Sequence, residues 1–303
     1  MKALLIMNPG SRSGRGRRLW ERWQTGLRFA GVSFRSAVTE APGHAIALAR
    51  EADDVDTVVA VGGDGTINEV LDGVVQSGRA GLRMGVLYSG TSPDFCRFHG
   101  IPLEPARALE TLLAGRAQRV DVARIDCRNG SGEPRRAHFA CSCNVGLGAA
   151  VARFSNGVRR CLGDALGTGL AVVRAVLRTP PVDLELEIDG QPCPLAAVNN
   201  LTVLKNPHIA SGLRLNVDLR PDDGRLCLVA VHGRGRVGLC GLLPRFYSGT
   251  AVDAEGVLVR KCARVRVQAH GGCEIEFDGD PRGALPAEIR VLPGALTLIG
   301  GAP

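Results

Sequence analysis

Short apolar runs and helical patterns alternate regularly over the first part of the chain, up to about residue 120. Continuous apolar runs predict buried strands, and apolar residues at helical spacing predict amphipathic helices between them. The expected strands are 2–7, 32–39, 57–61 and 84–88, and the expected helices are 15–29, 44–52, 66–76 and 105–113. This βαβ repetition favours an α/β domain over 1–120, with a parallel sheet covered by helices on both faces.

Beyond Arg119 the pattern changes to one strand after another, many of them separated by turns such as Asp189-Gly190. The expected strands are 120–127, 137–143, 182–188, 196–204, 226–231 and 265–269, and the expected helices are 163–178 and 237–247. The sequence therefore predicts a second, all-β domain over 121–287, a mostly antiparallel β-sandwich. A last strand, about 288–303, is expected to return to the first domain.

Composition narrows the class of protein. Of the 303 residues, 45% are hydrophobic and 22% charged, which is typical of a globular chain. Its apolar stretches fall short of the roughly 18 residues needed to span a bilayer, and the run Ala3 to Met7 is too short for a signal peptide, so we expect a cytoplasmic protein. The ten cysteines are scattered, which indicates reduced core residues.

The net charge of +7 suits nucleic acid, an anionic membrane surface or an anionic small ligand. Only 4% of residues are aromatic, and the arginines show no helix-turn-helix or stacking pattern, so nucleic acid is disfavoured as a partner. The histidines stand alone and the cysteines lack paired zinc spacings, which disfavours a Cys/His metal site.

The stretch VVAVGGDGTINEV, residues 58–70, places glycines and a carboxylate between a strand and a helix. Backbone N–H groups and the positive end of the helix dipole at such a turn can bind a phosphate. Asp64 cannot attract a phosphate itself, so its expected task is to hold magnesium or to orient a hydroxyl. The alternative is a tight turn in which Asp64 or Thr66 merely caps the helix.

Two further polar, glycine-bearing loops, residues 8–16 and 89–95, follow the first and fourth expected strands. Because ligands bind beyond the carboxyl ends of parallel strands, these loops and residues 62–66 are expected to form one crevice. Neither G-x-x-x-x-G-K-[ST] nor G-x-G-x-x-G is present, which disfavours a dinucleotide-dependent dehydrogenase.

Together these motifs closely resemble the diacylglycerol kinase catalytic-domain family, which includes bacterial lipid kinases and sphingosine and ceramide kinases. The matching segments are NPGSRSGRG (8–16), GGDGTINEV (62–70), GTSPDF (90–95), FHGIP (98–102), CNVGLG (143–148), PDDGRL (221–226) and FDGD (277–280). NAD kinases and phosphofructokinases share the GGDGT core, but the order and spacing of the segments favour the lipid-kinase branch.

The resemblance implies ATP and Mg²⁺ as cofactors. The residues it places around ATP are Asn8, Pro9, Gly10, Ser11, Arg12, Thr39, Gly62, Gly63, Asp64, Gly65, Thr66, Asn68, Glu69, Thr91 and Asp280. It assigns catalytic roles to Asp64 and to Asp278, the latter as the base that takes the proton of the acceptor hydroxyl. Taken alone, residues 278–280 also fit a plain hairpin turn, and Asp280 stands where the family has glutamate.

The resemblance also implies a structural magnesium, held by Asp223 and by the carbonyls of Arg220 and Arg225; a simple Asp-Gly hairpin is the alternative there. Ser92-Pro93-Asp94 departs from the Gly-Asn-Asp that is usual in the family. Proline removes both an amide side chain and a backbone N–H, which puts the geometry near Thr91 and the substrate class in question.

The implied acceptor is a lipid hydroxyl held between the domains at an anionic membrane surface, and the oligomeric state, including a homodimer, stays open. The basic, partly apolar segment 234–247 suits the inner face of a membrane, although an ordinary helix packed on a sheet is the alternative. Rival functions are a kinase of a soluble hydroxyl, similar to NAD kinase, and a non-catalytic nucleotide-binding regulator, for which Pro93 and Asp280 would be the signs.

Overall fold

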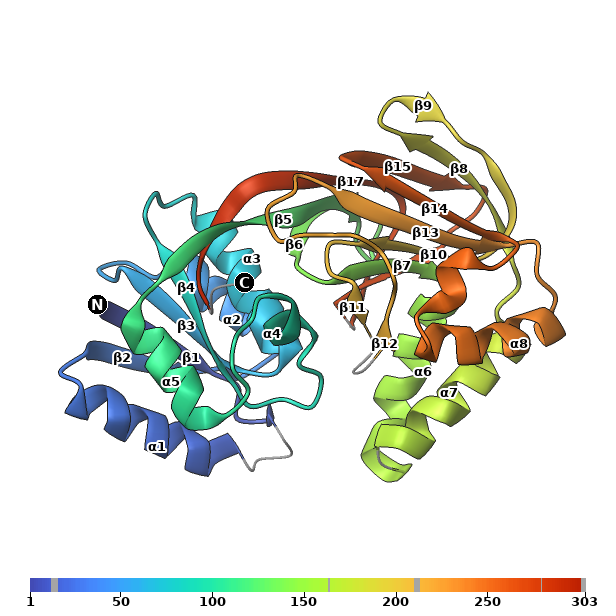
Figure 1. Cartoon of the computed structure of the whole chain (residues 1–303). Coiled ribbons are helices and arrows are strands. Elements are labelled where there is room, and N and C mark those ends of the chain that lie inside the picture. Colours follow the sequence, from blue (N-terminus) through green and yellow to red (C-terminus); the bar gives the residue numbers. More distant parts are fainter. Residues whose placement is uncertain (12–15, 163, 210–212, 279, 301–303) are drawn as a thin grey trace.

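The computed structural model describes residues 1–11, 16–162, 164–209, 213–278 and 280–300, and it consists of two lobes (Figure 1). Two long strands, β5 (Ala117–Arg128) and β17 (Asp280–Ile299), run from one lobe into the other. They pair with each other antiparallel along most of their length, from Ile299 opposite Ala117 to Ala284 opposite Arg128. The lobes are therefore joined by a two-stranded ribbon instead of a loose linker.

The N-terminal lobe contains the expected parallel sheet. In sheet order its strands are β2 (Ser33–Val38), β1 (Lys2–Met7), β3 (Thr57–Gly62), β4 (Arg83–Tyr88) and the end of β17. The helices that cover it are α1 (Gly16–Phe29), α2 (His44–Arg50), α3 (Asp64–Ser77) and α5 (Pro105–Ala114). The sequence prediction of an α/β domain is confirmed.

Helices pack on both faces of this sheet because its strands are apolar on both. In β1, Leu4 and Ile6 face the core formed with α2 and α3, whereas Leu5 faces Trp20 and Trp23 of α1. All of these side chains are buried. A strand that is buried on both faces has a continuous run of apolar residues, as β1 does from Ala3 to Met7.

The C-terminal lobe is mostly antiparallel, as expected of a β-sandwich. Its further strands are β6 (Pro134–Phe139), β7 (Ser142–Gly146), β8 (Val182–Ile188), β9 (Gln191–Pro192), β10 (Leu195–Leu204), β13 (Leu226–His232), β14 (Val257–Cys262), β15 (Arg264–Ala269) and β16 (Glu274–Phe277). Inward-facing residues of these strands, Phe139 and Phe277 among them, form one core. Through β17 the strands of both lobes belong to one hydrogen-bonded sheet within the described residues.

The remaining elements complete the two lobes. They are the helices α4 (Asp94–Phe98), α6 (Leu147–Leu162), α7 (Asp164–Arg178) and α8 (Arg236–Tyr247), the 3₁₀ turn at Thr250–Asp253, and the short hairpin of β11 (His208–Ile209) and β12 (Leu213–Arg214). α6, α7 and α8 lie together at one end of the sandwich (Figure 1). No helix of the described residues is both long enough and apolar enough to span a bilayer.

The structure differs from the sequence prediction at several elements. The single strand expected over 137–143 is two strands, because the backbone N–H groups of Ala140 and Cys141 donate to the carboxylate of Asp278 and leave the ladder. The helices α4 and α6 and the strands β14 and β16 were not expected, and β17 begins well before residue 288. The nine cysteines whose state the structure describes are free, and six of them are buried.

Candidate active site

A cavity of about 930 Å³ lies between the two lobes. Many of the residues expected around ATP line it, together with the expected base: Asn8, Pro9, Gly10, Ser11, Thr39, Gly63, Asp64, Gly65, Thr66, Glu69, Thr91 and Asp278. Gly62 and Asn68 are not part of its wall. Arg12 and the side chain of Asp280 lie outside the described residues. The crevice predicted at the carboxyl ends of the strands thus exists, and it is lined from both lobes.

Side-chain hydrogen bonds connect the first glycine loop, which begins at Asn8, to α3. The Nδ2 of Asn8 donates to Thr66 Oγ1 over 3.2 Å, and the Oδ1 of Asn8 accepts from the backbone N–H of Gly10 over 2.8 Å. Gly62 lies directly against Thr66, since a Cβ on Gly62 would come within 2.5 Å of the Thr66 side chain. Asn8 therefore bridges two parts of the wall, and Gly62, which is not in the wall, packs closely against Thr66, which is.

Gly63, in the second glycine loop (62–66), and Gly90, in the third (89–95), are required because the two loops touch backbone to backbone. A Cβ on Gly90 would lie 2.4 Å from the Cα of Gly63 and 2.9 Å from the hydroxyl of Tyr88. The backbone N–H of Ser89 also donates to the Gly62 carbonyl over 2.8 Å. No side chain fits between these loops, so glycine here serves the close approach of two strand ends as well as the approach of a ligand.

Two expected ATP residues on α3 differ in their surroundings: Asn68 is buried outside the cavity wall, whereas Glu69 lines the cavity and also holds two other segments. Asn68 is 2% exposed, and neither its amide nitrogen nor its amide oxygen has a hydrogen-bond partner among the described residues. Glu69 Oε1 accepts from the backbone N–H of Gly43 over 2.8 Å and lies 3.6 Å from the guanidinium of Arg282. Glu69 thus ties the loop after β2 and a residue of β17 to α3.

Two acidic residues from different loops, Asp64 and Asp94, lie next to each other in the cavity wall. The backbone N–H of Asp94 donates to Asp64 Oδ2 over 3.0 Å, and the buried Asp64 Oδ1 has no hydrogen-bond partner within the described chain. Burial raises the pKa of Asp64 to about 8, and the negative charges of Asp94 and Asp278 add to this rise. A site that disfavours an ionised carboxylate in this way attracts a cation or a proton.

The carboxylate of Asp278 is held in one orientation by three backbone donors. The N–H groups of Ala140, Cys141 and Ser142 each donate to it over 2.9 Å. Asp278 has a φ of 49°, a left-handed conformation, in the turn between β16 and β17. A position in a hairpin turn and the expected catalytic role are therefore compatible for this residue. Burial raises its pKa, although the three N–H donors oppose this effect.

Pro93, the departure in the third loop, is compatible with the local structure. It is buried and precedes the first turn of α4, where a missing backbone N–H costs no helical hydrogen bond. Its carbonyl accepts from the N–H of Arg97 over 2.9 Å, and the next N–H, that of Asp94, reaches Asp64. Proline therefore fits the position directly before α4, where the family usually has asparagine.

A chain of hydrogen bonds on the sandwich wall was not expected as a site. Asn144 Nδ2 donates to Glu276 Oε2 over 2.6 Å, Thr202 Oγ1 donates to Asn144 Oδ1 over 2.7 Å, and Asn200 Nδ2 donates to Thr202 Oγ1 over 2.9 Å. All four residues line the cavity. The signal in the sequence was polar residues that alternate with apolar ones along these strands: the apolar residues, such as Val145, Leu201 and Ile275, belong to the sandwich core, and the polar ones face the cavity.

Most of the remaining cavity wall is apolar and comes from the second lobe. Its apolar residues there are Leu147, Val151, Val172, Val176, Ile209, Leu213, Leu215, Val229, Val231, Leu239, Leu242, Leu243 and Phe246. They belong mostly to α6, α7, α8 and β13. The cavity thus has a polar end at the glycine loops and an apolar end under the three helices.

Comparison with known proteins identifies this arrangement. A family model of the diacylglycerol kinase catalytic domain matches residues 2–125, and a model of the YegS C-terminal NAD kinase beta sandwich-like domain matches residues 141–300. The chain belongs to the diacylglycerol kinase family. Its members are kinases, so the chain is an ATP-dependent phosphotransferase with an alcohol group as acceptor.

Similar proteins cover nearly the whole chain. A diacylglycerol kinase of Staphylococcus carnosus (strain TM300) is 24% identical over 95% of this chain and 91% of its own length, and one of Staphylococcus aureus (strain MRSA252) is 26% identical over 95% and 89%. The crystal structure of a diacylglycerol kinase from Bacillus anthracis str. Sterne superposes with a TM-score of 0.72 at 20% identity, covering 99% of this chain and 97% of that one. Yeast NADH kinase complexed with NADH has a TM-score of 0.56 at 13% identity over 100% and 84%.

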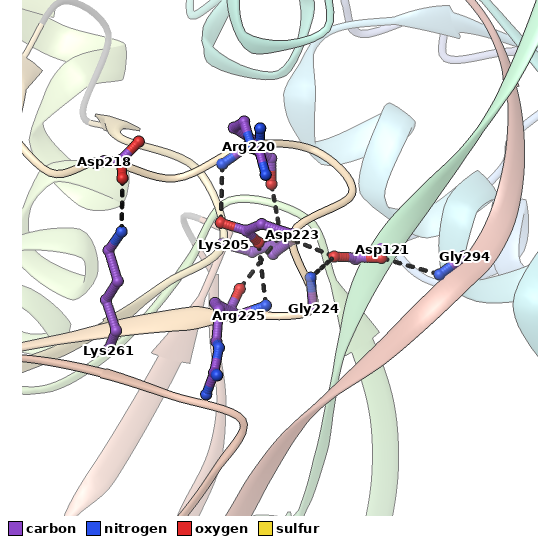
Figure 2. A network of polar contacts seen from close by, with 9 residues as sticks. All are labelled: Asp121, Lys205, Asp218, Arg220, Asp223, Gly224, Arg225, Lys261 and Gly294. Atoms are coloured by element: carbon purple, nitrogen blue, oxygen red, sulfur yellow. Dashed lines mark hydrogen bonds and ion pairs between the residues drawn. The ribbon is translucent and has the colours of Figure 1, made fainter.

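The second expected site of the diacylglycerol kinase family, the structural magnesium site, is occupied by a side chain. The carboxylate of Asp223 and the carbonyls of Arg220 and Arg225 do come together, but they surround the ammonium of Lys205 (Figure 2). Among the residues that the structure describes, no group of three or more His, Cys, Asp or Glu side chains is arranged to hold a metal ion. Lys205, which directly follows strand β10, was not predicted from the sequence as part of this site.

Proposed function

We propose that this protein transfers the γ-phosphate of ATP to a hydroxyl of diacylglycerol or a related lipid. The observation that carries the proposal is the division of the cavity into a polar end and an apolar end. A soluble acceptor such as NAD would leave the apolar wall under α6, α7 and α8 without a matching surface. Acyl chains would cover that wall and release its water, which favours a lipid.

The polar end suits magnesium ATP. The N-terminus of α3, a helix of 14 residues, presents backbone N–H groups and its positive dipole end at Gly63–Thr66, where phosphates would bind. Mg²⁺ is usually held by one or two carboxylates together with phosphate oxygens, and the unpaired Oδ1 of Asp64 fits this role, with Asp94 beside it. The ion would neutralise charge on the transferred phosphoryl group.

Asp278 is suited to act on the acceptor hydroxyl. Its carboxylate lies in the cavity wall, and its three backbone donors fix its orientation. A raised pKa brings a carboxylate closer to the range in which it can take up a proton. In the proposed reaction Asp278 accepts the proton of the lipid hydroxyl while that oxygen bonds to the γ-phosphorus and ADP leaves.

α8 offers a path for the lipid from a membrane. Four of its residues, Leu239, Leu242, Leu243 and Phe246, line the cavity, whereas Val237 on the same helix is 87% exposed. Segment 234–247 contains Arg234, Arg236 and Arg245 and no acidic residue. A basic segment with an exposed apolar residue suits an anionic lipid surface, so peripheral contact of a cytoplasmic protein with the membrane is part of the proposal.

The decisive experiment is transfer of labelled γ-phosphate from ATP to diacylglycerol, sphingoid bases, ceramide, phosphatidylglycerol and NAD, each offered separately. Asp278→Asn should lower kcat for the lipid acceptor by at least about 100-fold with unchanged ATP affinity. Asp218→Asn is the matched control, because Asp218 is an exposed carboxylate paired with Lys261 at the surface.

A second variant separates a lipid from a soluble acceptor. Leu239→Asp places a charge on the apolar wall, so kcat/KM for a lipid should fall at least about tenfold while ATP affinity stays constant. Label that appears only in NAD, or an unchanged lipid rate in Leu239→Asp, would contradict the lipid proposal. Binding of ATP without transfer to any acceptor would point to a nucleotide-binding regulator.

A further inference from the structure

Lys205 is a buried ammonium enclosed by oxygen atoms. Its residue is 1% exposed, and its Nζ lies 2.8 Å from the carbonyl of Arg220, 2.8 Å from Asp223 Oδ1, 3.2 Å from the carbonyl of Arg225 and 3.2 Å from Asp121 Oδ2 (Figure 2). An ammonium has three N–H donors, so these four acceptors satisfy it fully. We call these four oxygens the Lys205 cage.

A divalent ion does not fit the Lys205 cage while the ammonium of Lys205 is inside it. Three of the four oxygens, those of Arg220, Asp223 and Arg225, are the ligands that the family resemblance assigns to a structural magnesium. Their distances from Nζ are those of N–H···O hydrogen bonds, whereas Mg²⁺ requires oxygens at about 2.0–2.1 Å and Ca²⁺ at about 2.3–2.6 Å. The ammonium also occupies the centre, where the ion would have to be.

The charges around Lys205 match a cation. A buried ammonium is stable only with opposite charge beside it, and the carboxylates of Asp121 and Asp223 supply that charge. The pKa of Asp223 is lowered, because the opposing effect of burial, although the largest single one, is outweighed by the hydrogen bond from Lys205, its charge and two backbone N–H donors together. Burial, together with the nearby Lys205 charge, also lowers the pKa of His99 to about 3, so its imidazole stays neutral.

The cage holds together the elements that join the two lobes. Asp121, on β5, accepts from the N–H of Gly224 over 2.7 Å and from the N–H of Gly294, on β17, over 2.9 Å. Its own N–H donates to the carbonyl of Pro221 over 2.7 Å. One ammonium thus stabilises a carboxylate that connects both interlobe strands to the turn at 220–225.

The cage is also connected to the candidate active site through the backbone around Lys205. The N–H of Lys205 donates to the carbonyl of Cys141 over 2.9 Å, and Cys141 is one of the three residues whose N–H groups hold Asp278. The next residue, Asn206, donates through its side chain to the carbonyl of Asp94 over 2.9 Å. Removing the ammonium from the cage would therefore disturb the positions of Asp278 and Asp94.

We propose that Lys205 is a built-in cation that takes the place of the structural divalent ion, so that the junction between the lobes is held without metal. Lys205 directly follows β10 and is part of the chain, so its charge remains in the cage when divalent ions are removed. This proposal concerns the fold and does not depend on which acceptor the enzyme phosphorylates.

Thermal unfolding without nucleotide tests the proposal. Protein carrying Asp64→Asn, which removes the candidate magnesium carboxylate of the active site, should unfold within about 1 °C of the same temperature in EDTA and in Mg²⁺ or Ca²⁺, because no ion enters the cage. Lys205→Ala should unfold roughly 10 °C lower in EDTA, since it leaves two buried carboxylates unpaired. Added Ca²⁺ or Mg²⁺ should restore part of that loss by entering the vacated cage.

Two control variants make the result specific. Lys205→Met fills the space without a charge, so it should be destabilised in EDTA and gain nothing from divalent ions. Lys261→Ala removes a neighbouring lysine whose pairing with Asp218 is exposed, so its unfolding temperature should stay within about 2 °C of wild type (Figure 2).

A further pair of variants separates the cage from the active site. If Mg²⁺ stabilises the wild type by binding at Asp64, the effect should disappear in Asp64→Asn and persist in Asp223→Asn. The proposal is overturned if wild-type protein contains a tightly bound divalent ion that is lost in Asp223→Asn, or if Lys205→Ala unfolds at the wild-type temperature in EDTA. Should Lys205→Ala fail to fold, metal analysis of the wild type still decides.

Discussion

The carboxylate of Asp64 and the backbone N–H of Asp94 form a hydrogen bond of 3.0 Å between the second and third glycine loops. This bond brings a second carboxylate, that of Asp94, close to Asp64, and its negative charge helps burial to raise the pKa of Asp64. The two loops are thus held together at the expense of electrostatic repulsion. Such a site is stable when a proton or a cation is bound and strained when neither is present.

The raised pKa of Asp64 predicts how stability depends on pH. Its pKa is about 8 in the folded protein and 3.8 ordinarily, so the folded state holds a proton that the unfolded state releases between these values. The resulting stabilisation is complete below pH 4 and is lost as the pH rises through 8. Asp64→Asn remains neutral, so its unfolding temperature should exceed that of wild type by a margin that grows from pH 5 to pH 9.

This prediction is measured by thermal unfolding over that pH range without nucleotide or divalent ions. Asp218→Asn is the control, because Lys261 lowers the pKa of this exposed carboxylate and its loss cannot give the same trend. A margin for Asp64→Asn that is constant or shrinks with pH would contradict the assignment. Phosphotransfer should be lost in Asp64→Asn at every pH.

Two glycine-to-alanine variants separate packing from ligand binding. Gly90→Ala should lower the unfolding temperature, because its methyl group would overlap the backbone of Gly63, and overpacking costs about 1–3 kcal/mol. Gly65→Ala meets nothing within 4 Å, so the fold should be as stable as wild type or slightly more so. Because Gly65 lines the cavity, ATP should bind about tenfold more weakly to Gly65→Ala.

Unfolding curves and ATP titration of both variants provide the measurement. Gly63 and Gly90 belong to different loops, so a stable Gly90→Ala protein would show that the loops have room to separate. Unchanged ATP affinity in Gly65→Ala would argue against phosphate binding at the N-terminus of α3.

The hydrogen-bonded chain on the sandwich wall is expected to position the acceptor. Thr202→Val removes the hydroxyl that joins Asn144 to Asn200 while keeping the shape of the side chain. An unpaired buried polar group costs about 1–3 kcal/mol, so kcat/KM for the acceptor should fall about tenfold while KM for ATP stays constant. Thr202→Ser keeps the hydroxyl and should behave as wild type. Equal loss in both variants would indicate that only packing matters at this position.

Much of the fold followed from local signals. The βαβ pattern predicted the parallel sheet because its strands are apolar on both faces, and the strand over 182–188 was predicted with its observed bounds. The break within 137–143 could not be foreseen, because it depends on Asp278, about 140 residues further along the chain. The length of β17 likewise depends on pairing with β5 across most of the sequence.

The candidate site was predictable where loops carry glycine and acidic residues together, and less so where single residues act through distant partners. Asp64 and Asp278 stand in short motifs, and both line the cavity. Lys205 stands in no such motif. The side chain of a lysine that follows an apolar strand usually extends into solvent, so nothing in the sequence indicated a buried one. Only the fold brings Asp121 and Asp223 to the same ammonium.

The proposed contact with a membrane predicts a specific role for an exposed side chain of α8. Val237 is 87% exposed and Arg236 adjoins it, so Val237→Asp should reduce sedimentation with vesicles containing phosphatidylglycerol several-fold by adding a charge that resists burial in lipid. Phe29→Asp is the matched control, since Phe29 is 97% exposed at the end of α1, in the other lobe. Both variants should phosphorylate a lipid dispersed in detergent at the wild-type rate, because neither residue lines the cavity. Equal vesicle binding by Val237→Asp and wild type would mean that another surface contacts the membrane.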